Sequence, residues 1–224
     1  MGLTLTPGPT KRYIKTVVLI DGEFLENVVR DSFQGKVLHL RPFLPKIASA
    51  FDADLEISDS IRTYYYDAVH EVPSDDPNFE EKRRKKIALL NYLEENCPKV
   101  EVKRGFLRFP ADPEEGLEQK GVDALLSSDM ALIAWMGKVE RIILVAADGD
   151  YVPAVEVAKR AMTNVYLLSD KKKLSPHLKR TVDIWKLNLA DLMSELGVHD
   201  PKTIAEAGVI PTELINDKAL GGKS

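Results

Sequence analysis

The sequence has one cysteine, no long apolar run and no excess of positive charge. Cys97 has no second cysteine to pair with, which excludes an internal disulfide framework. No apolar stretch is long enough to cross a bilayer and no secretory signal is evident, so we expect a cytoplasmic protein that has no membrane contact. With 31 Lys and Arg against 35 Asp and Glu, the net charge of -4 does not by itself indicate a nucleic-acid-binding protein.

The chain length and composition favour one domain with short extensions. At 224 residues and 44% hydrophobic content, the chain can bury one sizeable core. Residues 1–12 combine Pro, Gly and Thr without apolar periodicity and predict a flexible N-terminal arm. We expect the main domain to span residues 13–197 and residues 198–224 to form a C-terminal extension.

Apolar strand-like runs alternate with helix-like segments along the main domain. Because each run is nearly unbroken, the pattern predicts a parallel sheet covered on both faces, an α/β fold. In such sheets the ligand site lies at the carboxyl ends of the strands, where the strand order reverses. The expected strands are 16–21, 61–69, 99–109, 141–147 and 164–169, and the expected helices are 23–31, one from about Pro42 to Phe51, 78–96, 118–136, 152–162 and 187–197.

Acidic residues follow two of these strands. Asp21 ends the first expected strand, and Asp148 and Asp150 follow the fourth in "ILVAADGDY". If the two strands are neighbours, the carboxylates converge, and their mutual repulsion requires a cation or protons. Oxygen ligands without accompanying His or Cys favour Mg²⁺ or a similar ion over zinc. Each aspartate also has a purely structural interpretation as a turn former or helix cap.

The segment 118–136 places a further acid on its apolar face. Extending the stripe of Val122, Leu125 and Leu126 by one turn reaches Asp129, where a leucine would be expected. Because an unpaired buried carboxylate is destabilising, Asp129 needs a partner such as a metal, a lysine or a backbone amide.

Two more charged residues lie at the start of the same segment. Asp123 points about 120° away from Asp129 and lies in the first turn, where the helix dipole favours an anion. Lys120 can neutralise a carboxylate, bind a phosphate or remain solvated.

Four sequence motifs together resemble a known family. They are "VVLIDGEFL", "QKGVDALLSSDM", "VAADGDYVPAVEVAKR" and "NVYLLSDKKKLSPHLKRTVDIWKL", which span about residues 16–190. The chain resembles the NYN domain proteins of the LabA-like group, relatives of the PIN-domain nucleases. This resemblance implies a three-layer α/β/α sandwich with the PIN-like strand order 3-2-1-4-5 and an acidic Mg²⁺ or Mn²⁺ site.

The resemblance also implies a function and a set of site residues. It implies a metal-dependent ribonuclease that hydrolyses phosphodiester bonds of RNA, with single-stranded RNA as the expected substrate. The metal ligands implied are Asp21, Asp129, Asp148 and Asp150, and Asp123 joins them in the catalytic set.

One position departs from the family pattern. The motif IDG is usually followed, one residue further on, by Asn, whereas Phe24 stands there in this chain. Asn27 lies one turn later on the same helical face and is a candidate substitute.

Several residues are candidates for RNA contacts. Tyr66, in the tyrosine triplet at the end of the second expected strand, offers a stacking face for a base. The lysines and arginine after the fifth strand suit RNA phosphates. The full predicted set is Asn27, Tyr66, Lys120, Lys171, Lys172, Lys179 and Arg180.

The main alternative is a catalytically weak or inactive RNA-binding or regulatory protein with the same fold. Two other phosphoryl-transfer folds fit less well, because "DGE" lacks the second aspartate of a haloacid-dehalogenase-like motif and the first strand lacks the glutamate of a Toprim domain. The sequence leaves open the RNA substrate, endo or exo polarity, the number of metal ions and whether the chain forms a homodimer.

Overall fold

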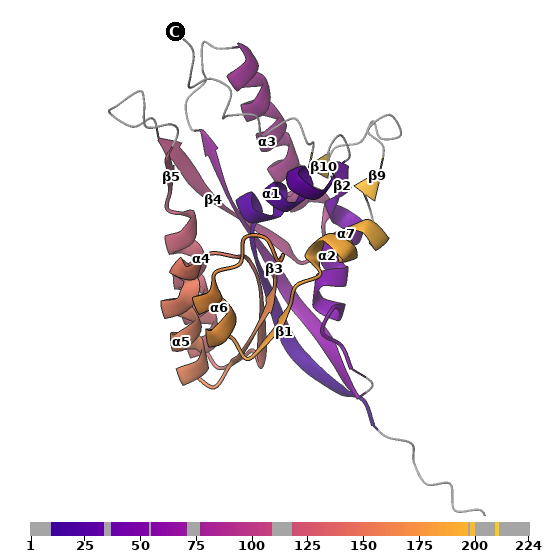
Figure 1. Ribbon diagram of the computed structural model, residues 1–224, viewed down its shortest axis with the longest axis vertical. Coiled ribbons are helices and arrows are strands. Elements are labelled where there is room, and N and C mark those ends of the chain that lie inside the picture. Colours follow the sequence, from indigo (N-terminus) through magenta and orange to yellow (C-terminus); the bar gives the residue numbers. More distant parts are fainter. Residues whose placement is uncertain are drawn as a thin grey trace, which may run out of the picture.

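The computed structural model shows a central β-sheet with helices on both faces (Figure 1). It describes residues 10–33, 37–53, 55–70, 77–108, 118–196, 198–199 and 209–210. Within these residues seven strands lie in the order β5-β4-β3-β1-β6-β7-β8, parallel except for β5, which is antiparallel to β4. The strands are β1 (Arg12–Asp21), β3 (Glu56–His70), β4 (Val100–Arg108), β5 (Glu118–Lys120), β6 (Arg141–Val145), β7 (Asn164–Leu168) and β8 (Ile184–Lys186).

The helices form the two outer layers of a three-layer sandwich. Side chains of α1, α2, α3 and α7 pack on one face of the sheet, and those of α4, α5 and α6 pack on the other. The helices are α1 (Gly22–Ser32), α2 (Leu40–Ser49), α3 (Pro77–Asn96), α4 (Val122–Trp135), α5 (Val152–Arg160), α6 (Pro176–Thr181) and α7 (Leu189–Leu196), and a short 3-10 turn, η1 (Gly149–Tyr151), precedes α5. None of the described helices is long and apolar enough to cross a membrane.

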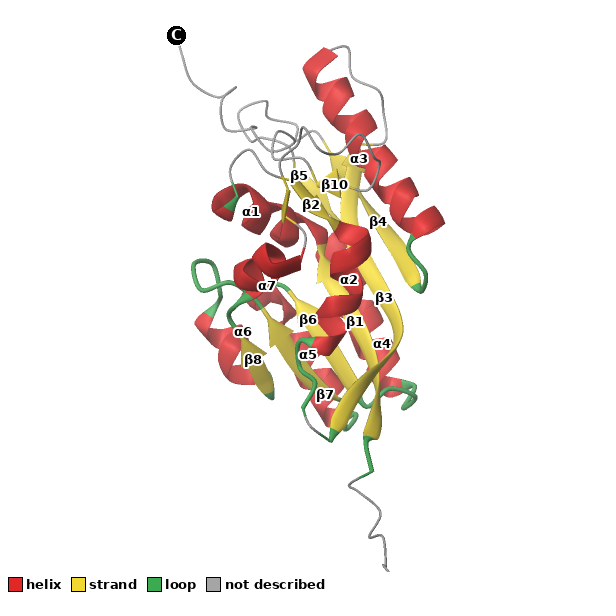
Figure 2. Ribbon diagram, turned by 90° about the vertical axis from the view of Figure 1, so that its right-hand side faces the viewer, coloured by secondary structure: helices red, strands yellow, loops and turns green. Residues whose placement is uncertain are grey.

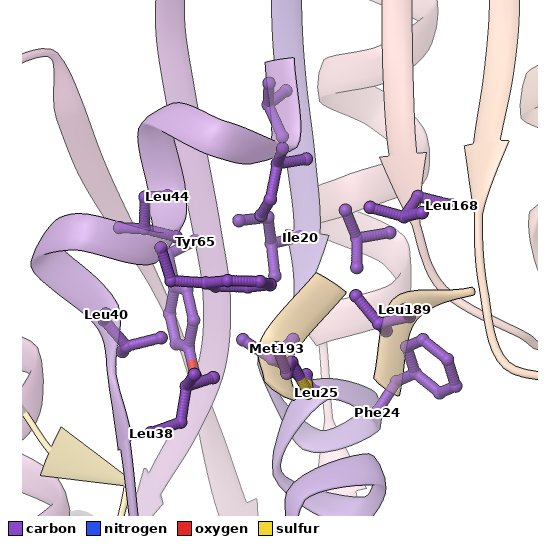
Figure 3. Packing of buried hydrophobic residues seen from close by; sticks show 14 of the residues in the cluster. Ile20, Phe24, Leu25, Leu38, Leu40, Leu44, Tyr65, Leu168, Leu189 and Met193 are labelled. Carbon is purple, nitrogen blue, oxygen red and sulfur yellow. The ribbon is translucent and has the colours of Figure 1, made fainter. Parts of the chain in front are cut away.

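The central strands are buried on both faces, as their unbroken apolar runs predict. On β1, Ile20 points into the core beneath α1 and α7, and Leu19 points into the core beneath α4 and α5. Figure 3 shows the first of these cores, where Ile20 and Leu168 from the sheet lie near Leu189 and Met193 from α7. Because the core fixes β1 between β3 and β6, the carboxyl end of β1 has a defined position.

The predicted five-strand order is found, with differences in detail. The five expected strands correspond to β4-β3-β1-β6-β7, and β5 and β8 add one strand at each edge. Residues 118–120 were predicted as helix but form β5, because Gly121 takes a left-handed conformation (φ 86°) and the helix begins at Val122. The short helix α6 was not predicted either.

Part of the predicted C-terminal extension belongs to a second, smaller sheet. Its antiparallel strands are ordered β10-β2-β9. Two segments of the extension therefore pair with a strand of the main domain. The strands are β2 (Val37–His39), β9 (Val198–His199) and β10 (Val209–Ile210).

Candidate functional site

Asp21 lies at the carboxyl end of β1 and at the start of α1. Its Oδ1 accepts a hydrogen bond from the backbone N–H of Phe24 at 3.0 Å, so the carboxylate caps the helix. The residue is only 9% exposed. Burial raises the pKa of Asp21 to about 7, and the nearby charges of Glu23 and Asp123 act in the same direction, against the lowering effect of its hydrogen bonds.

Tyr151 joins Asp21 to a second carboxylate. Its hydroxyl oxygen lies 3.0 Å from Asp21 Oδ2 and 2.7 Å from Asp123 Oδ1. Because a phenol carries one proton, it can donate to only one of the two carboxylates, so the other contact needs a proton from the carboxyl group itself. Burial raises the pKa of Asp21 to about 7, so the Asp21 carboxyl group can supply this proton below about pH 7. The end of β1, the η1 turn and the first turn of α4 thus meet in one hydrogen-bonded group.

Glu23 extends this acidic group and was not among the predicted site residues. Partial burial raises the pKa of its carboxyl group, and Asp67 and Asp123 raise it further, against the lowering effect of Lys86 and Arg30. The sequence signal was present, since Glu23 stands two residues after Asp21 in the first turn of the same helix.

A buried ion cluster lies beneath Glu23. Lys86 Nζ of α3 contacts Glu26 Oε1 of α1 at 2.5 Å and Asp67 Oδ2 of β3 at 2.8 Å. Glu26 and Asp67 are both buried. One lysine thus faces two carboxyl groups, and burial raises the pKa of Glu26 to about 7 against the lowering effect of Lys86.

Gly22 lets β1, β3 and α1 approach one another at this point. A Cβ atom there would lie 2.7 Å from the backbone oxygen of Tyr66, 2.8 Å from Tyr65 Cε1 and 2.9 Å from Asp67 Oδ2. We predict that Gly22→Ala lowers the free energy of unfolding by about 1–3 kcal/mol, because the backbone of β3 must move. Urea denaturation followed by circular dichroism measures this, and an unchanged midpoint would show that the space exists.

Asp148 and Asp150 form a separate, exposed loop at the end of β6. Asp148 Oδ1 accepts a hydrogen bond from the backbone N–H of Asp150 at 3.0 Å and so caps η1. The N–H of Ser175 donates to the carbonyl oxygen of Ala147 at 2.9 Å, which attaches the start of α6 to this loop. The capping role that the sequence offered for Asp148 is therefore confirmed.

Asp129 has different partners from those of Asp21. Its Oδ2 accepts a hydrogen bond from the Tyr66 hydroxyl at 2.9 Å and lies 3.8 Å from Lys103 Nζ. The prediction that Asp129 has a partner is confirmed. Tyr66 is 0% exposed, so its predicted role as a stacking face for RNA bases is wrong.

The apolar stripe of α4 explains where Asp129 points. The buried residues are Val122, Leu126, Met130 and Ala134, spaced by four, whereas Leu125 is exposed. Asp129 therefore lies at the flank of the stripe and faces β3 and β4 instead of the centre of the core.

A model of a known protein family matches most of the chain. The model of the NYN domain matches residues 15–185, more than three quarters of the chain. The chain belongs to the NYN domain family. This is a PIN-like nuclease superfamily domain, as the sequence motifs predict. A solved structure of a protein of unknown function from Vibrio parahaemolyticus shares the fold, with a TM-score of 0.50, 18% identity and coverage of 82% of this chain and 96% of the other. No curated protein matches the sequence.

The four predicted metal ligands do not form one metal-binding group among the described residues of this structure. Among the described residues, no three His, Cys, Asp or Glu side chains are arranged to hold a metal ion. The predicted ligands are divided among the Asp21 group, the Asp148 loop and the Asp129 contact with β3 and β4. Sequence spacing put the acids on one edge but could not show how far apart their side chains lie.

Phe24, the residue that departs from the NYN motif, belongs to the hydrophobic core. It is buried and lies near Leu189 of α7 (Figure 3). Asn27 accepts a hydrogen bond from Arg30 through its side-chain oxygen. No described contact joins Asn27 to Asp21, so its proposed substitution for the family asparagine has no structural support.

The basic residues predicted to bind RNA lie mostly beside the Asp148 loop. Lys171 and Lys172 are exposed just after β7, and Lys179 and Arg180 belong to α6. Lys120 belongs to β5, and its side chain lies outside the described atoms.

Proposed function

We propose that this NYN domain protein is a metal-dependent ribonuclease that hydrolyses single-stranded RNA. The observation that carries the proposal is the pairing of Asp21 and Asp123 through the Tyr151 hydroxyl at the carboxyl end of β1. Asp21 is buried and Asp123 is exposed, and carboxylates that repel one another at such a boundary are a common feature of sites that bind cations or handle protons. The family supports nuclease chemistry for this arrangement.

The carboxylates of Asp21 and Asp123 suit Mg²⁺, because this ion does not require a full set of protein ligands. Mg²⁺ retains several waters and is often held by one or two carboxylates together with substrate phosphates. Two carboxylate oxygens, each within hydrogen-bond distance of one phenol oxygen, supply that donor set. When bound, Mg²⁺ or Mn²⁺ would polarise the scissile phosphate and lower the pKa of a bound water.

The residues of the chain have separable roles in this proposal. Tyr151 holds the two carboxylates in a fixed relation, and Asp21 and Asp123 would hold the ion through deprotonated carboxylate oxygens. Lys171, Lys172 and Arg180 contact the phosphates of the RNA on the neighbouring loop and helix.

Cleavage of labelled single-stranded RNA, with and without Mg²⁺, tests the proposal. We expect Mg²⁺-dependent cleavage that falls by about 100-fold or more in Asp21→Asn, since a metal ligand is lost. Asp59→Asn is a matched control, because Asp59 is exposed near the opposite end of the sheet. Equal cleavage by the Asp21→Asn variant and the wild-type protein would contradict the assignment.

A non-cleaving RNA-binding protein is the second candidate. It is favoured by the structural hydrogen bonds of the acids, since Asp21 and Asp148 cap helical turns and Asp129 accepts from Tyr66. RNA retention without cleavage, unchanged by Mg²⁺ or by Asp21→Asn, would support this candidate.

A further inference from the structure

Trp185 presents an indole ring at an edge of the central sheet. It belongs to β8, whose three side chains are all exposed, and the residue itself is 45% exposed. β8 pairs only with β7 in this sheet, so its other side faces outward (Figure 2). Lys179 Nζ of α6 lies 3.9 Å from the centroid of the Trp185 ring. An aromatic face beside a cation is the combination that binds unpaired bases together with their phosphates.

The segment around Trp185 is strongly basic in an acidic chain. Residues 171–186 contain six basic residues against one acidic residue, a net charge of +5, whereas the whole chain carries -4. The single acid, Asp183, is already engaged by the backbone N–H of Val165 at 2.8 Å and by Lys159 at 3.0 Å. Only Lys173 of these six pairs with an acid of the described chain, Asp31 at 2.7 Å. The other five are Lys171, Lys172, Lys179, Arg180 and Lys186.

The basic residues of α3, in contrast, are largely paired with acids of the same helix. Arg83 and Arg84 both pair with Glu80, and Lys85 pairs with Glu81. Acids of the protein therefore neutralise much of the charge on α3. Within the described residues, the segment 171–186 keeps several neighbouring cations that can replace the counterions of a polyanion.

The segment is attached directly to the loop that carries Asp148 and Asp150. Ser175 donates a backbone hydrogen bond to Ala147, next to Asp148, and a Cβ atom at Gly149 would lie 2.9 Å from Ser175 Oγ. Lys179 follows Ser175 by one helical turn, which is about 6 Å along the axis. An RNA strand held at Trp185 can thus extend along α6 toward the Asp148 loop.

We propose that Trp185 stacks on an unpaired base of a single-stranded RNA whose phosphates are held by Lys179 and the unpaired cations of residues 171–180. This inference rests on the proposed function and assigns a stacking residue to it. Base stacking on an exposed indole requires a base that is free of a duplex, so the surface favours single strands over double helices.

Tryptophan fluorescence of the full chain tests the inference. The sequence has two tryptophans, so Trp135→Phe leaves Trp185 as the sole tryptophan, which can be excited selectively over the tyrosines at long wavelength. Asp21→Asn is added to prevent cleavage, and oligouridylate of about twelve nucleotides serves as the probe. We expect saturable quenching over the concentration range in which the anisotropy of labelled RNA rises. An abasic ribose-phosphate oligomer of equal length should raise the anisotropy signal without quenching.

The RNA affinity of Trp185 variants is the second measurement. We expect Trp185→Leu to weaken RNA binding roughly tenfold and Trp185→Phe to retain most of the affinity, because only the latter keeps an aromatic face. Thermal melting establishes that each variant is folded. RNA binding without quenching, together with unchanged affinity in Trp185→Leu, would overturn the inference. Absence of RNA binding would overturn it too. The cleavage assay on the wild-type protein decides separately whether the ribonuclease proposal stands.

Discussion

Asp21→Asn is expected to make the protein more stable above pH 7 while removing its cleavage activity. The buried carboxylate of Asp21 faces Asp123 through Tyr151, and its charged form is unfavourable in the folded state. Asparagine can keep the cap on the Phe24 N–H, because its side-chain oxygen accepts a hydrogen bond as the carboxylate does. The substitution therefore removes the charge and retains the local structure.

The pH dependence of this effect has a definite sign. The pKa of Asp21 is about 7 in the folded protein and 3.8 in a model peptide, so the folded state binds the extra proton between these values. The contribution of Asp21 to the free energy of unfolding consequently falls as pH rises from about 4 to about 7. The stability gain of Asp21→Asn over the wild-type protein should be near zero at pH 4 and reach roughly 2–4 kcal/mol above pH 7.

Urea denaturation of the two proteins at pH 4, 6 and 8, without divalent metal, measures this difference. Asp59→Asn serves as the control and should change the stability by no more than about 0.5 kcal/mol. Added Mg²⁺ should stabilise the wild-type protein at pH 8 and leave Asp21→Asn unaffected. A loss of stability in Asp21→Asn at pH 8 would show that the carboxylate is structural and not held under electrostatic strain.

The second large effect is expected at the buried ion cluster. Lys86→Met removes the cation that faces Glu26 and Asp67, leaving two buried carboxyl groups without a counter-charge. Although burial favours the neutral form of the lysine, Asp67 and Glu26 hold the pKa of Lys86 above its usual value. We predict that Lys86→Met lowers the free energy of unfolding by about 3–5 kcal/mol near neutral pH.

Two control variants show whether the loss of stability comes from the buried ion cluster or from any substitution on α3. Lys85→Met changes the adjacent residue, whose 2.7 Å pair with Glu81 is largely exposed, and should cost no more than about 1 kcal/mol. Neutralising the acids in a Lys86→Met, Glu26→Gln, Asp67→Asn variant should recover much of the lost stability. If Lys86→Met and Lys85→Met are equally stable in urea, the cluster contributes nothing to folding.

The central strands of the sheet could be predicted because buried apolar runs mark them in the sequence. Residues 17–20 of β1 and 142–145 of β6 are unbroken apolar runs buried on both faces, a pattern typical of covered parallel strands. The edge strands β5 and β8 could not be predicted in this way. β8 is three residues long with every side chain exposed, and β5 is specified by its pairing with β4 and by the turn at Gly121.

The sequence predicted some residues of the candidate site and missed others, for a physical reason. Acids at strand ends identified Asp21, because the carboxyl edge of a parallel sheet is set by topology. Tyr151 was missed because a tyrosine after an acidic turn has no periodic signature, and only the packing of η1 on α4 brings its hydroxyl to Asp123. Tyr66 was assigned to RNA because strand alternation did not show that α4 covers it.

The most direct test of the account is a crystal of the full chain soaked in Mn²⁺. If Asp21 and Asp123 hold the ion, an anomalous scattering peak lies within about 2.5 Å of a carboxylate oxygen of each. A peak confined to the exposed Asp148 and Asp150 loop, or no peak beside Asp21, would contradict the assignment of this carboxylate pair as the metal site.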